Sequence, residues 1–435
     1  MGSPKRATYG FLTAFLVAMS PKLASRFTAN DMSKGLSQLS SRNLALGQIS
    51  SGQSVRFEKG SGIYTGPGYR STATPVASVR VDAIKEATVF SALWIKTGTK
   101  VQYSEDAVTW YDTGVTVTAA RRTAIVEQSN GDIMVNNITD APLRFVVGRA
   151  TVAIADTDVT ITFANSDVRG KFPASGTVYV RGDAITYTGV SGATLTGVAG
   201  IVSGGHPINS LVVLSQNPST WDAEKGYTMM SYESRLLVAG RLGLEGVLYY
   251  SAPEDAANPA FFYDFDANGA GARIFPTGIT GMISGLGRGY LFGQKQVHEL
   301  GGFDLATGSL LSTPISETYG AYNPACVVDM DGVIAFMGQR RLMPITLQVS
   351  PDASVSPFLG ENFDENIRAW LETHDDADAQ ADAYLKWDSA KKILKLGAVV
   401  NGALETYVHD ADSRAFAPLE RRNLGSSSMF LGKSY

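Results

Sequence analysis

The sequence is poor in the residues that most metal-binding and catalytic sites require. Of its 435 residues, one is cysteine, Cys326, and four are histidine. A single cysteine excludes an intrachain disulfide and a cysteine-based zinc site, so we expect Cys326 to be a small buried apolar residue. The histidines, at positions 206, 298, 374 and 409, are too far apart for the spacing of a helical or hairpin metal site.

Charged residues are also scarce. They make up 18% of the chain, against about 25% in ordinary soluble domains, which leaves surface for burial against other subunits. The sequence has no G-x-S-x-G, no glycine-rich phosphate loop and no H-E-x-x-H. We therefore expect a protein that is not an enzyme, with no catalytic residues and no cofactor.

Long apolar runs are missing as well. The segment Tyr9–Met19 follows Lys5 and Arg6 and looks like a secretory signal, but at 11 residues it is too short to span a bilayer. No other run approaches 18 apolar residues. We interpret residues 1–42 as an N-terminal arm that packs on this chain or on a neighbour, and we expect no stable membrane insertion.

What the chain does contain is a repeated β pattern. Residues 235–253 read as two short strands around a glycine-rich turn, and similar units recur at a spacing of roughly 40 residues. This pattern is typical of a β-propeller, which is built from small antiparallel sheets. The predicted fold is therefore mainly β, a β-propeller with an inserted small β domain and a short N-terminal arm.

Hairpin turns support this fold class. Asn130-Gly131, Asp331-Gly332 and Asn401-Gly402 each lie between β segments, where they favour type I′ turns. One amphipathic helix is predicted in the C-terminal half, because apolar side chains from Phe363 to His374 share one face.

A shift in composition marks an insertion. Residues 151–206 are almost free of lysine and glutamate and rich in threonine, glycine and valine. Propeller-like strands resume after this segment. The predicted domains are an arm at 1–42, propeller segments at 43–150 and 207–425, the inserted module at 151–206 and a tail at 426–435.

Charge is distributed unevenly. Residues 1–60 carry a net charge of +6, and residues 361–388 carry −7. Such asymmetry is typical of a basic arm and an acidic rim, although two solvated faces explain it equally well. If the chain surrounds DNA, the acidic residues are candidates for lining the channel, where they would let DNA slide without binding. These residues are Asp375, Asp376, Asp378 and Asp382.

Two short motifs suggest cation sites. Asp264, Asp266 and Asn268 match the first half of an EF-hand loop, but Phe275 stands where the bidentate glutamate belongs, so an Asx-rich turn is the simpler interpretation. A hairpin turn likewise explains Asp329 and Asp331. We therefore predict no metal site, with Asp264, Asp266 and Asn268 as weak candidates. His298 with Glu299 and Asp304 suggests acid–base chemistry, but a histidine at a strand end is the simpler explanation.

Several motifs resemble known phage proteins. The segment from Phe172-Pro173 through "ITYTG" and "LTG" to His206 resembles a small β module of phage structural proteins. Residues 210–422 resemble the propeller of the tail hub, or nozzle, proteins of short-tailed bacteriophages, including the packaged-DNA-stabilization type. The matching stretches are "SRLLVAG" with "GVLYYSAP", "GYLFGQKQVHELGG", "YGAYNPACVVDMDGVIAFMG" and "ENIRAWL".

The resemblance implies a virion structural protein, made in the host bacterial cytoplasm and located in the phage tail. Its implied partners are further copies of the chain (six in that family), portal and adaptor proteins, tail fibre or needle proteins, and passing double-stranded DNA. The resemblance also implies that the ring conducts packaged DNA and has a role in retaining it.

Two other functions stay open. A carbohydrate- or receptor-binding propeller of the tail would use exposed aromatic residues, for which Trp94, Trp110 and Trp221 are candidates. A propeller glycosidase would need paired carboxylates, which an acidic propeller can supply.

Overall fold

The computed structural model describes most of the chain between residues 81 and 423. The described ranges are 35–36, 48–49, 55–58, 62–65, 81–106, 108–119, 123–164, 171–216, 225–253, 265, 268–285, 287–304, 307–338, 341–347, 353–355, 383–389, 392–400, 403–410 and 415–423. The apolar segment Tyr9–Met19, the helix predicted from Phe363 to His374 and the tail at 426–435 lie outside them.

The chain divides into two compact units, each described by itself. One comprises Arg70–Pro324 with Gly425–Tyr435, and the other Met1–Tyr69 with Ala325–Leu424. Within the described residues, the regular structure is β apart from one 3-10 turn, Pro324–Cys326.

The unit Arg70–Pro324 contains four antiparallel blades of four strands each. In blades 1, 3 and 4 the strands follow one another in up-and-down order. In blade 2 the fourth strand comes after an insertion, two strands of which extend the sheet to six. Blade 1 is β5 (Val81–Ala87), β6 (Ala92–Thr97), β7 (Lys100–Ser104) and β8 (Tyr111–Thr116). Blade 2 is β9 (Thr123–Glu127), β10 (Ile133–Asn137), β11 (Leu143–Arg149) and β17 (Leu211–Gln216). Blade 3 is β18 (Thr228–Tyr232), β19 (Arg235–Arg241), β20 (Leu244–Tyr250) and β21 (Gly271–Ile274). Blade 4 is β22 (Ile279–Gly285), β23 (Arg288–Gly293), β24 (Val297–Phe303) and β25 (Leu310–Ser316).

The other unit contains two further blades and two short strand pairs. Blade 5 is β26 (Val327–Asp329), β27 (Ile334–Gly338), β28 (Arg341–Leu347) and β29 (Ala353–Val355). Blade 6 is β30 (Tyr384–Asp388), β31 (Ile393–Val400), β32 (Ala403–Asp410) and β33 (Ala415–Asn423). The short pairs are β1 (Gly35–Leu36) with β2 (Gln48–Ile49), which is parallel, and β3 (Val55–Glu58) with β4 (Gly62–Thr65), which is antiparallel.

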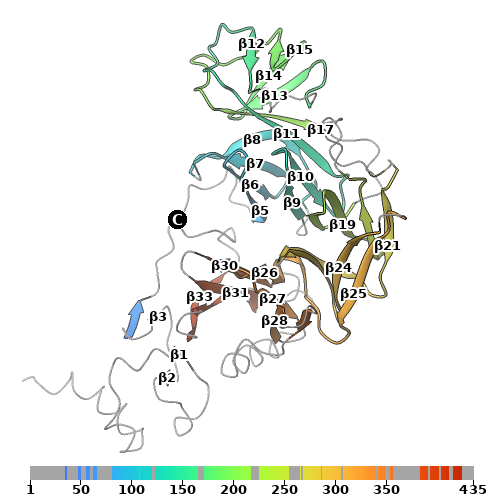
Figure 1. Ribbon diagram of the computed structural model, residues 1–435. Helices are drawn as coiled ribbons and strands as arrows, with labels where there is room; N and C mark the ends of the chain where they lie inside the picture. The colour runs from blue at the N-terminus through green and yellow to red at the C-terminus, as the bar shows by residue number, and fades with distance from the viewer. Residues whose placement is uncertain are drawn as a thin grey trace, which may run out of the picture. The chain divides into compact units, whose positions relative to one another are not determined.

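The blades stack through their first strands and their faces. β5 lies against β9, β9 against β18 and β18 against β22, so that the sheets of the unit Arg70–Pro324 follow one another face to face (Figure 1). Apolar cores fill the space between neighbouring sheets: blades 1 and 2 share one core, and blades 3 and 4 share another. This is the construction of a β-propeller, and the predicted mainly β, propeller-type fold is confirmed.

Turn chemistry was predicted correctly at one hairpin and wrongly at another. In the turn between β26 and β27, Asp331 and Gly332 have φ values of 53° and 99°, as a type I′ turn requires. Between β9 and β10, only Gly131 has a positive φ, and its N–H donates to the carbonyl of Gln128 over 2.9 Å. That hairpin therefore has a longer loop closed by a glycine, and the type I′ prediction is wrong there.

Two other local predictions are met. Val400 pairs with Ala403 across the predicted Asn401-Gly402 hairpin, whose two turn residues lie outside the described ranges. The side chain of Cys326 is fully buried, as expected for a small apolar residue. Within the described residues, no helix has the length and apolar character needed to cross a bilayer.

The segment between β11 and β17 forms a module with five strands of its own. They are β12 (Thr160–Thr162), β13 (Gly176–Val180), β14 (Asp183–Tyr187), β15 (Gly189–Ser191) and β16 (Thr194–Thr196). β12, β16 and β15 form a separate three-stranded sheet, whereas β13 and β14 extend blade 2 through hydrogen bonds between β13 and β17. Figure 1 shows the module in green beside β11 and β17.

β11 and β17 are buried on both faces. They pair directly with each other at six positions, from Arg144↔Gln216 to Arg149↔Leu211. Because side chains alternate along a strand, one set enters the core shared with blade 1, including Phe145 and Val213. The other set, Val146, Val212 and Leu214, enters the core of the module. The module thus covers a face of blade 2 that would otherwise be exposed.

We predict that the blades fold without the module. Replacing residues 151–206 by a short Gly/Ser bridge leaves the β11–β17 pairing intact, so thermal unfolding followed by circular dichroism should stay cooperative. Val146, Val212 and Leu214 become exposed in this variant, so it should bind a hydrophobic dye and aggregate. Changing all three to threonine in the same background should reverse both effects. Loss of cooperative unfolding in both variants would show that the module is required for the blades to fold.

Candidate functional site

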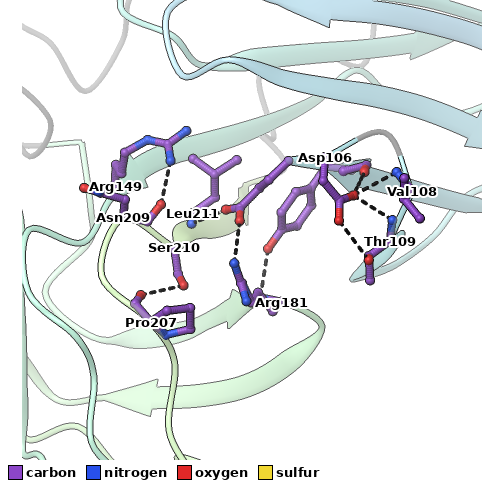
Figure 2. A network of polar contacts seen from close by, with 12 residues as sticks. Asp106, Val108, Thr109, Arg149, Arg181, Pro207, Asn209, Ser210 and Leu211 are labelled. Carbon is purple, nitrogen blue, oxygen red and sulfur yellow. Dashed lines mark hydrogen bonds and ion pairs between the residues drawn. The ribbon is translucent and has the colours of Figure 1, made fainter. Parts of the chain in front are cut away.

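A network of charged and polar contacts lies where the module meets blades 1 and 2. Arg181, in the turn between β13 and β14, donates from Nη2 to Oε2 of Glu105 over 3.0 Å. The other carboxylate oxygen of Glu105 accepts the backbone N–H of Leu211, the first residue of β17, at 2.7 Å. Arg181 and Leu211 are labelled in Figure 2 among the residues of this network. The Glu105 side chain of blade 1 therefore binds both the module and β17. We call this region, where the module meets blades 1 and 2, the joint.

Tyr103 and Arg181 make a second contact at this joint. The backbone N–H of Arg181 donates to the Tyr103 hydroxyl over 2.9 Å, and Arg181 has a φ of 51°. This left-handed conformation is uncommon for a residue other than glycine and directs the N–H at the buried ring. Burial raises the pKa of Tyr103, so its hydroxyl stays protonated at neutral pH. A buried Trp94 ring packs beside it, with centroids 5.4 Å apart.

Arg149 attaches the base of the module to blade 1. Its guanidinium donates to the carbonyl of Asn209 over 2.6 Å (Figure 2). It also donates to the carbonyl of Phe90. Asn209 lies just before β17 and Phe90 lies in the β5–β6 turn. The chain therefore leaves and re-enters blade 2 at a point that is fixed to its neighbour.

A buried ion cluster lies at the β9–β10 turn. Arg144 donates to Oδ2 of Asp132 from Nε at 3.0 Å and from Nη2 at 2.6 Å, while Nζ of Lys171 donates to Oδ1 over 3.1 Å. The side chains of Asp132, Lys171 and Arg144 are 0%, 1% and 3% exposed. Lys171 also donates to the carbonyl of Asn130 over 2.8 Å. A single carboxylate thus compensates two buried cations, one from blade 2 and one from the start of the module.

Carboxylates also connect the first hairpins of other blades to their neighbours. Glu127 of blade 2 accepts the backbone N–H groups of Thr88 and Val89 in the β5–β6 turn, each at 2.8 Å. In the other unit, Asp331 of blade 5 accepts from Ser389 over 2.8 Å and from Lys392 over 2.6 Å. Hydrogen bonds from Lys392 and Ser389 lower the pKa of Asp331 to about 2. The Asp331 carboxylate is therefore engaged by protein groups, and no cation is needed to explain it.

Asp106 closes the β7–β8 turn beside the joint. It accepts the N–H groups of Val108 and Thr109 at 2.8 Å and 2.7 Å, and the hydroxyls of Thr109 and Ser104 (Figure 2). Partial burial acts to raise the pKa of Asp106, but these hydrogen bonds outweigh it and lower the pKa to about 2. Both carboxylates of the turn Ser104-Glu105-Asp106 therefore have structural roles.

The EF-hand-like motif is described in part. Asp264 and Asp266 lie outside the described residues, whereas Asn268 is exposed and precedes Gly269, whose carbonyl accepts from Arg235. Phe275 is 4% exposed in the core between blades 3 and 4. Among the described residues, no three His, Cys, Asp or Glu side chains are grouped as a metal site requires.

His298, Glu299 and Asp304 have separate partners. The His298 ring packs edge-on against Phe275 with centroids 5.0 Å apart, and both of its nitrogens are buried without a hydrogen bond. Glu299 pairs with Arg288, and Asp304 accepts from Thr307 in its own turn. The structure does not bring the three side chains together for acid–base chemistry.

The tryptophans suggested for sugar stacking are largely unavailable. Trp94 and Trp110 are 1% and 7% exposed, and Trp94 packs against Tyr103 and Phe145. Trp221 lies outside the described residues, as do the predicted channel residues Asp375, Asp376, Asp378 and Asp382.

The contacts that join the module to blades 1 and 2 could not be predicted from the sequence. Asp132 and Lys171 are 39 residues apart, and Glu105 and Arg181 are 76 apart, so no local spacing connects them. One signal was present: Lys171 is the single lysine of the otherwise lysine-free segment 151–206. A lone lysine next to an apolar Phe172-Pro173 pair indicates a buried cation that needs a carboxylate from elsewhere.

Comparisons with known proteins gave only weak structural similarity. No family model and no curated protein matches the sequence. Hsv2 of Kluyveromyces lactis is 11% identical, with a TM-score of 0.31 over 80% of this chain and 100% of its own. A catalytically inactive virginiamycin B lyase from Staphylococcus aureus with quinupristin is 9% identical, with a TM-score of 0.32 over 76% and 96%. A functionally unknown protein from Desulfotomaculum acetoxidans is 10% identical, with a TM-score of 0.33 over 76% and 94%.

We predict that Asp132 is essential for stability. Asp132→Asn removes the carboxylate that the buried Arg144 and Lys171 share and should lower the free energy of unfolding by about 3–5 kcal/mol, measured by urea denaturation. Lys171→Met keeps the Asp132–Arg144 pair and should cost clearly less. Asp156→Asn, at an exposed position of the module, serves as the control and should change stability by less than about 0.5 kcal/mol. Equal losses in Asp132→Asn and Lys171→Met would argue against charge balance as the cause.

We predict that mild acid destabilises the fold through two histidines. Burial lowers the pKa of His206, with Arg181 acting the same way and Asp183 opposing it. Burial also lowers the pKa of His298, with Arg273 adding to the effect and Glu317 opposing it. Because unfolded histidine titrates near about 6.5, the unfolded chain binds more protons below that pH, and the free energy of unfolding should fall as pH decreases.

This pH dependence can be checked by urea denaturation on both sides of that value. The double variant His206→Leu/His298→Leu should show a smaller decrease in stability between neutral pH and mild acid than the wild type. An unchanged decrease would assign the effect to other groups.

Proposed function

We propose that this protein is a virion structural protein of a phage tail, which forms a homo-oligomeric ring of six copies below the portal and adaptor. The ring conducts packaged DNA and helps to retain it. Its place is the tail of the virion, and its partners are other copies of the chain, connector proteins and tail fibre or needle proteins.

One observation carries the proposal. Two groups of buried and half-buried charges in the unit Arg70–Pro324 join the module to the blades: Asp132 with Lys171 and Arg144, and Glu105 with Arg181. Large apolar side chains are at the same time exposed on the module and on blade 3. These charges stabilise the structure and are not available for catalysis. Exposed apolar side chains are typical of surfaces that bind other subunits, so the two observations together favour a structural protein that assembles with other subunits.

The sequence motifs give the proposal its phage context. The stretches "SRLLVAG" with "GVLYYSAP" form β19 and β20 of blade 3, and "GYLFGQKQVHELGG" covers most of β23 and β24 of blade 4. The phage-like module is the one that interrupts blade 2.

The direct test is a reconstruction of the particle that contains this chain. We expect several copies related by rotational symmetry around the tail axis, with the channel of the ring continuous with the portal. A single copy per tail, or copies placed on fibres away from the axis, would contradict the proposal.

A conduit should bind DNA weakly. The net charge of the chain is −4, and like charge lowers the affinity gained by releasing counterions from the phosphates. We expect purified protein to bind duplex DNA no tighter than the non-specific range of about 10⁻⁴ to 10⁻⁶ M at physiological salt, measured by fluorescence anisotropy. Submicromolar, sequence-dependent binding would point to a dedicated DNA-binding protein.

The acidic residues can be tested in the same framework. Changing Asp375, Asp376, Asp378 and Asp382 together to asparagine should slow DNA exit from particles if these residues line the channel. An unchanged exit rate would place them elsewhere.

A further inference from the structure

The imidazole ring of His206 is buried in the module, and its Nε2 atom has no hydrogen bond. The side chain is 3% exposed, and Oδ2 of Asp183 lies 3.8 Å from Nε2. This distance is too long for a hydrogen bond, but it is within the range of an ion pair once the ring is protonated. Buried polar atoms are nearly always paired, so an unpaired ring nitrogen beside a carboxylate indicates a group whose contacts change with its protonation.

The backbone of His206 is fixed to the opposite segment of the module. Its N–H donates to the carbonyl of Ile154 over 2.7 Å, and its own carbonyl accepts the N–H of Ile154 over 2.8 Å. Gly205 has a φ of 61°, and a β-carbon at this position would lie 2.1 Å from the carbonyl oxygen of Ile154. A movement of the His206 backbone therefore has to open its pairing with Ile154.

Two side-chain contacts connect the same two segments of the module. The β13–β14 hairpin contributes Arg181 and Asp183, and the segment 206–211, which returns to β17, begins with His206 and ends with Leu211. Glu105 of blade 1 binds Arg181 and Leu211, whereas Asp183 and His206 face each other. A change in the charge of His206 therefore acts on the two segments that Glu105 holds to blade 1.

The charged groups around the ring come from the hairpin and from the segment that pairs with His206. Burial has the largest effect and lowers the pKa of His206, Asp183 opposes it, and Arg181 adds to it as a like charge. On the other segment, Asp158 accepts a backbone N–H of its own turn over 2.7 Å, and Asp156 is exposed. Protonation is therefore unfavourable as long as the ring stays buried beside Arg181.

The apolar core of the module does not respond to mild acid. Its buried members are valine, alanine, isoleucine, leucine and phenylalanine side chains together with Tyr187, whose pKa is raised to about 12 by burial. None of these side chains changes its charge between about pH 5 and 8. Acid can therefore act on the joint while the core keeps the module on β11 and β17.

We propose that His206 is a proton-sensitive switch of the joint, and that protonation of its ring in mild acid loosens the hold of Glu105 on the β13–β14 hairpin and on the start of β17. At neutral pH the ring is uncharged and buried, and the Glu105 contacts fix the module to blade 1. In mild acid an open form, in which the ring reaches water, binds the proton more tightly than the closed form, so opening becomes more favourable. The switch operates within one chain and does not require a ring of copies.

Hydrogen exchange of the full-length protein measures this opening. The reporters are the backbone N–H groups of Arg181 and Leu211, which both donate to side chains of blade 1. After correction for the intrinsic pH dependence of exchange, their opening constants should rise by about tenfold for each pH unit below about 6.5, as expected for the uptake of one proton. The N–H of Val117, which donates to the carbonyl of Thr99 within blade 1, is the internal control and should keep its protection. Opening constants of Arg181 and Leu211 that do not depend on pH would overturn the proposal.

Two matched histidine variants assign the effect to one ring. His206→Gln retains a polar side chain that cannot be protonated, so the acid response at Arg181 and Leu211 should disappear. His298→Gln changes another histidine whose pKa is lowered by burial, but it lies on β24, so the response at the joint should remain. A full response in His206→Gln would assign the proton uptake to Glu105 or another group, and a loss of the response in His298→Gln would place its origin outside the joint. Either result would overturn the proposal.

Asp183→Asn tests the contact on which the switch depends. Removing this carboxylate leaves burial and Arg181 unopposed, so the pKa of His206 in the closed joint should fall further. The rise in opening should then continue to a lower pH than in the wild type. An unchanged end point would show that Asp183 does not act on His206 and would contradict the proposed switch.

The wild-type protein gives an independent readout, which also serves if His206→Gln does not fold. The resonance of the His206 ring, followed by NMR, should titrate with a midpoint below about 6.5, and opening at Leu211 should stop rising near that midpoint. A midpoint at or above about 6.5 would overturn the proposal, because the closed joint would then bind the proton as well as the open one.

Discussion

The carboxylate of Asp132 receives hydrogen bonds from parts of the chain that no local element connects. Arg144 comes from β11, Lys171 from the start of the module, and the backbone N–H of Val147 adds a contact at 3.2 Å. Two cations and one anion are fully removed from water, and such a cluster is stable only when its geometry is held from all sides. The position of the module on blade 2 therefore depends on this group more than on any surface contact.

The strands beside that cluster explain why the module and the blades form one body within their unit. β11 and β17 give alternate side chains to two cores, so neither face of this part of blade 2 is left for solvent. Glu105 and Arg149 then fix the same strands to blade 1 from the edge. Apolar burial supplies the attraction, and the buried charges select one arrangement of the sheets.

Local chemistry predicted much of the fold, and distant contacts account for the rest. Asp331-Gly332 adopts the expected turn because both residues tolerate positive φ, and the contacts of the Asp331 side chain with Ser389 and Lys392 are compatible with that turn. Asn130-Gly131 does not, because the side chain of Asn130 accepts the N–H of Asp132, whose carboxylate is committed to the ion cluster. The β strands and the break at residue 151 followed from periodicity and composition. The contacts of the joint could not be predicted in this way, because Glu105 and Arg181 meet only after the module has folded against blade 1.

The direct pairing of β11 with β17 has a consequence for how the chain acquires its structure. The residues that pair, such as Arg149 and Leu211, are separated by the whole module, so closing this sheet early would cost considerable loop entropy. During synthesis β11 emerges first and has an open edge until the module and β17 have followed. Collapse of the module shortens the effective loop and brings β17 to that edge. The order of assembly should then run from module to sheet, which makes the inserted segment a folding aid for the blade that it interrupts.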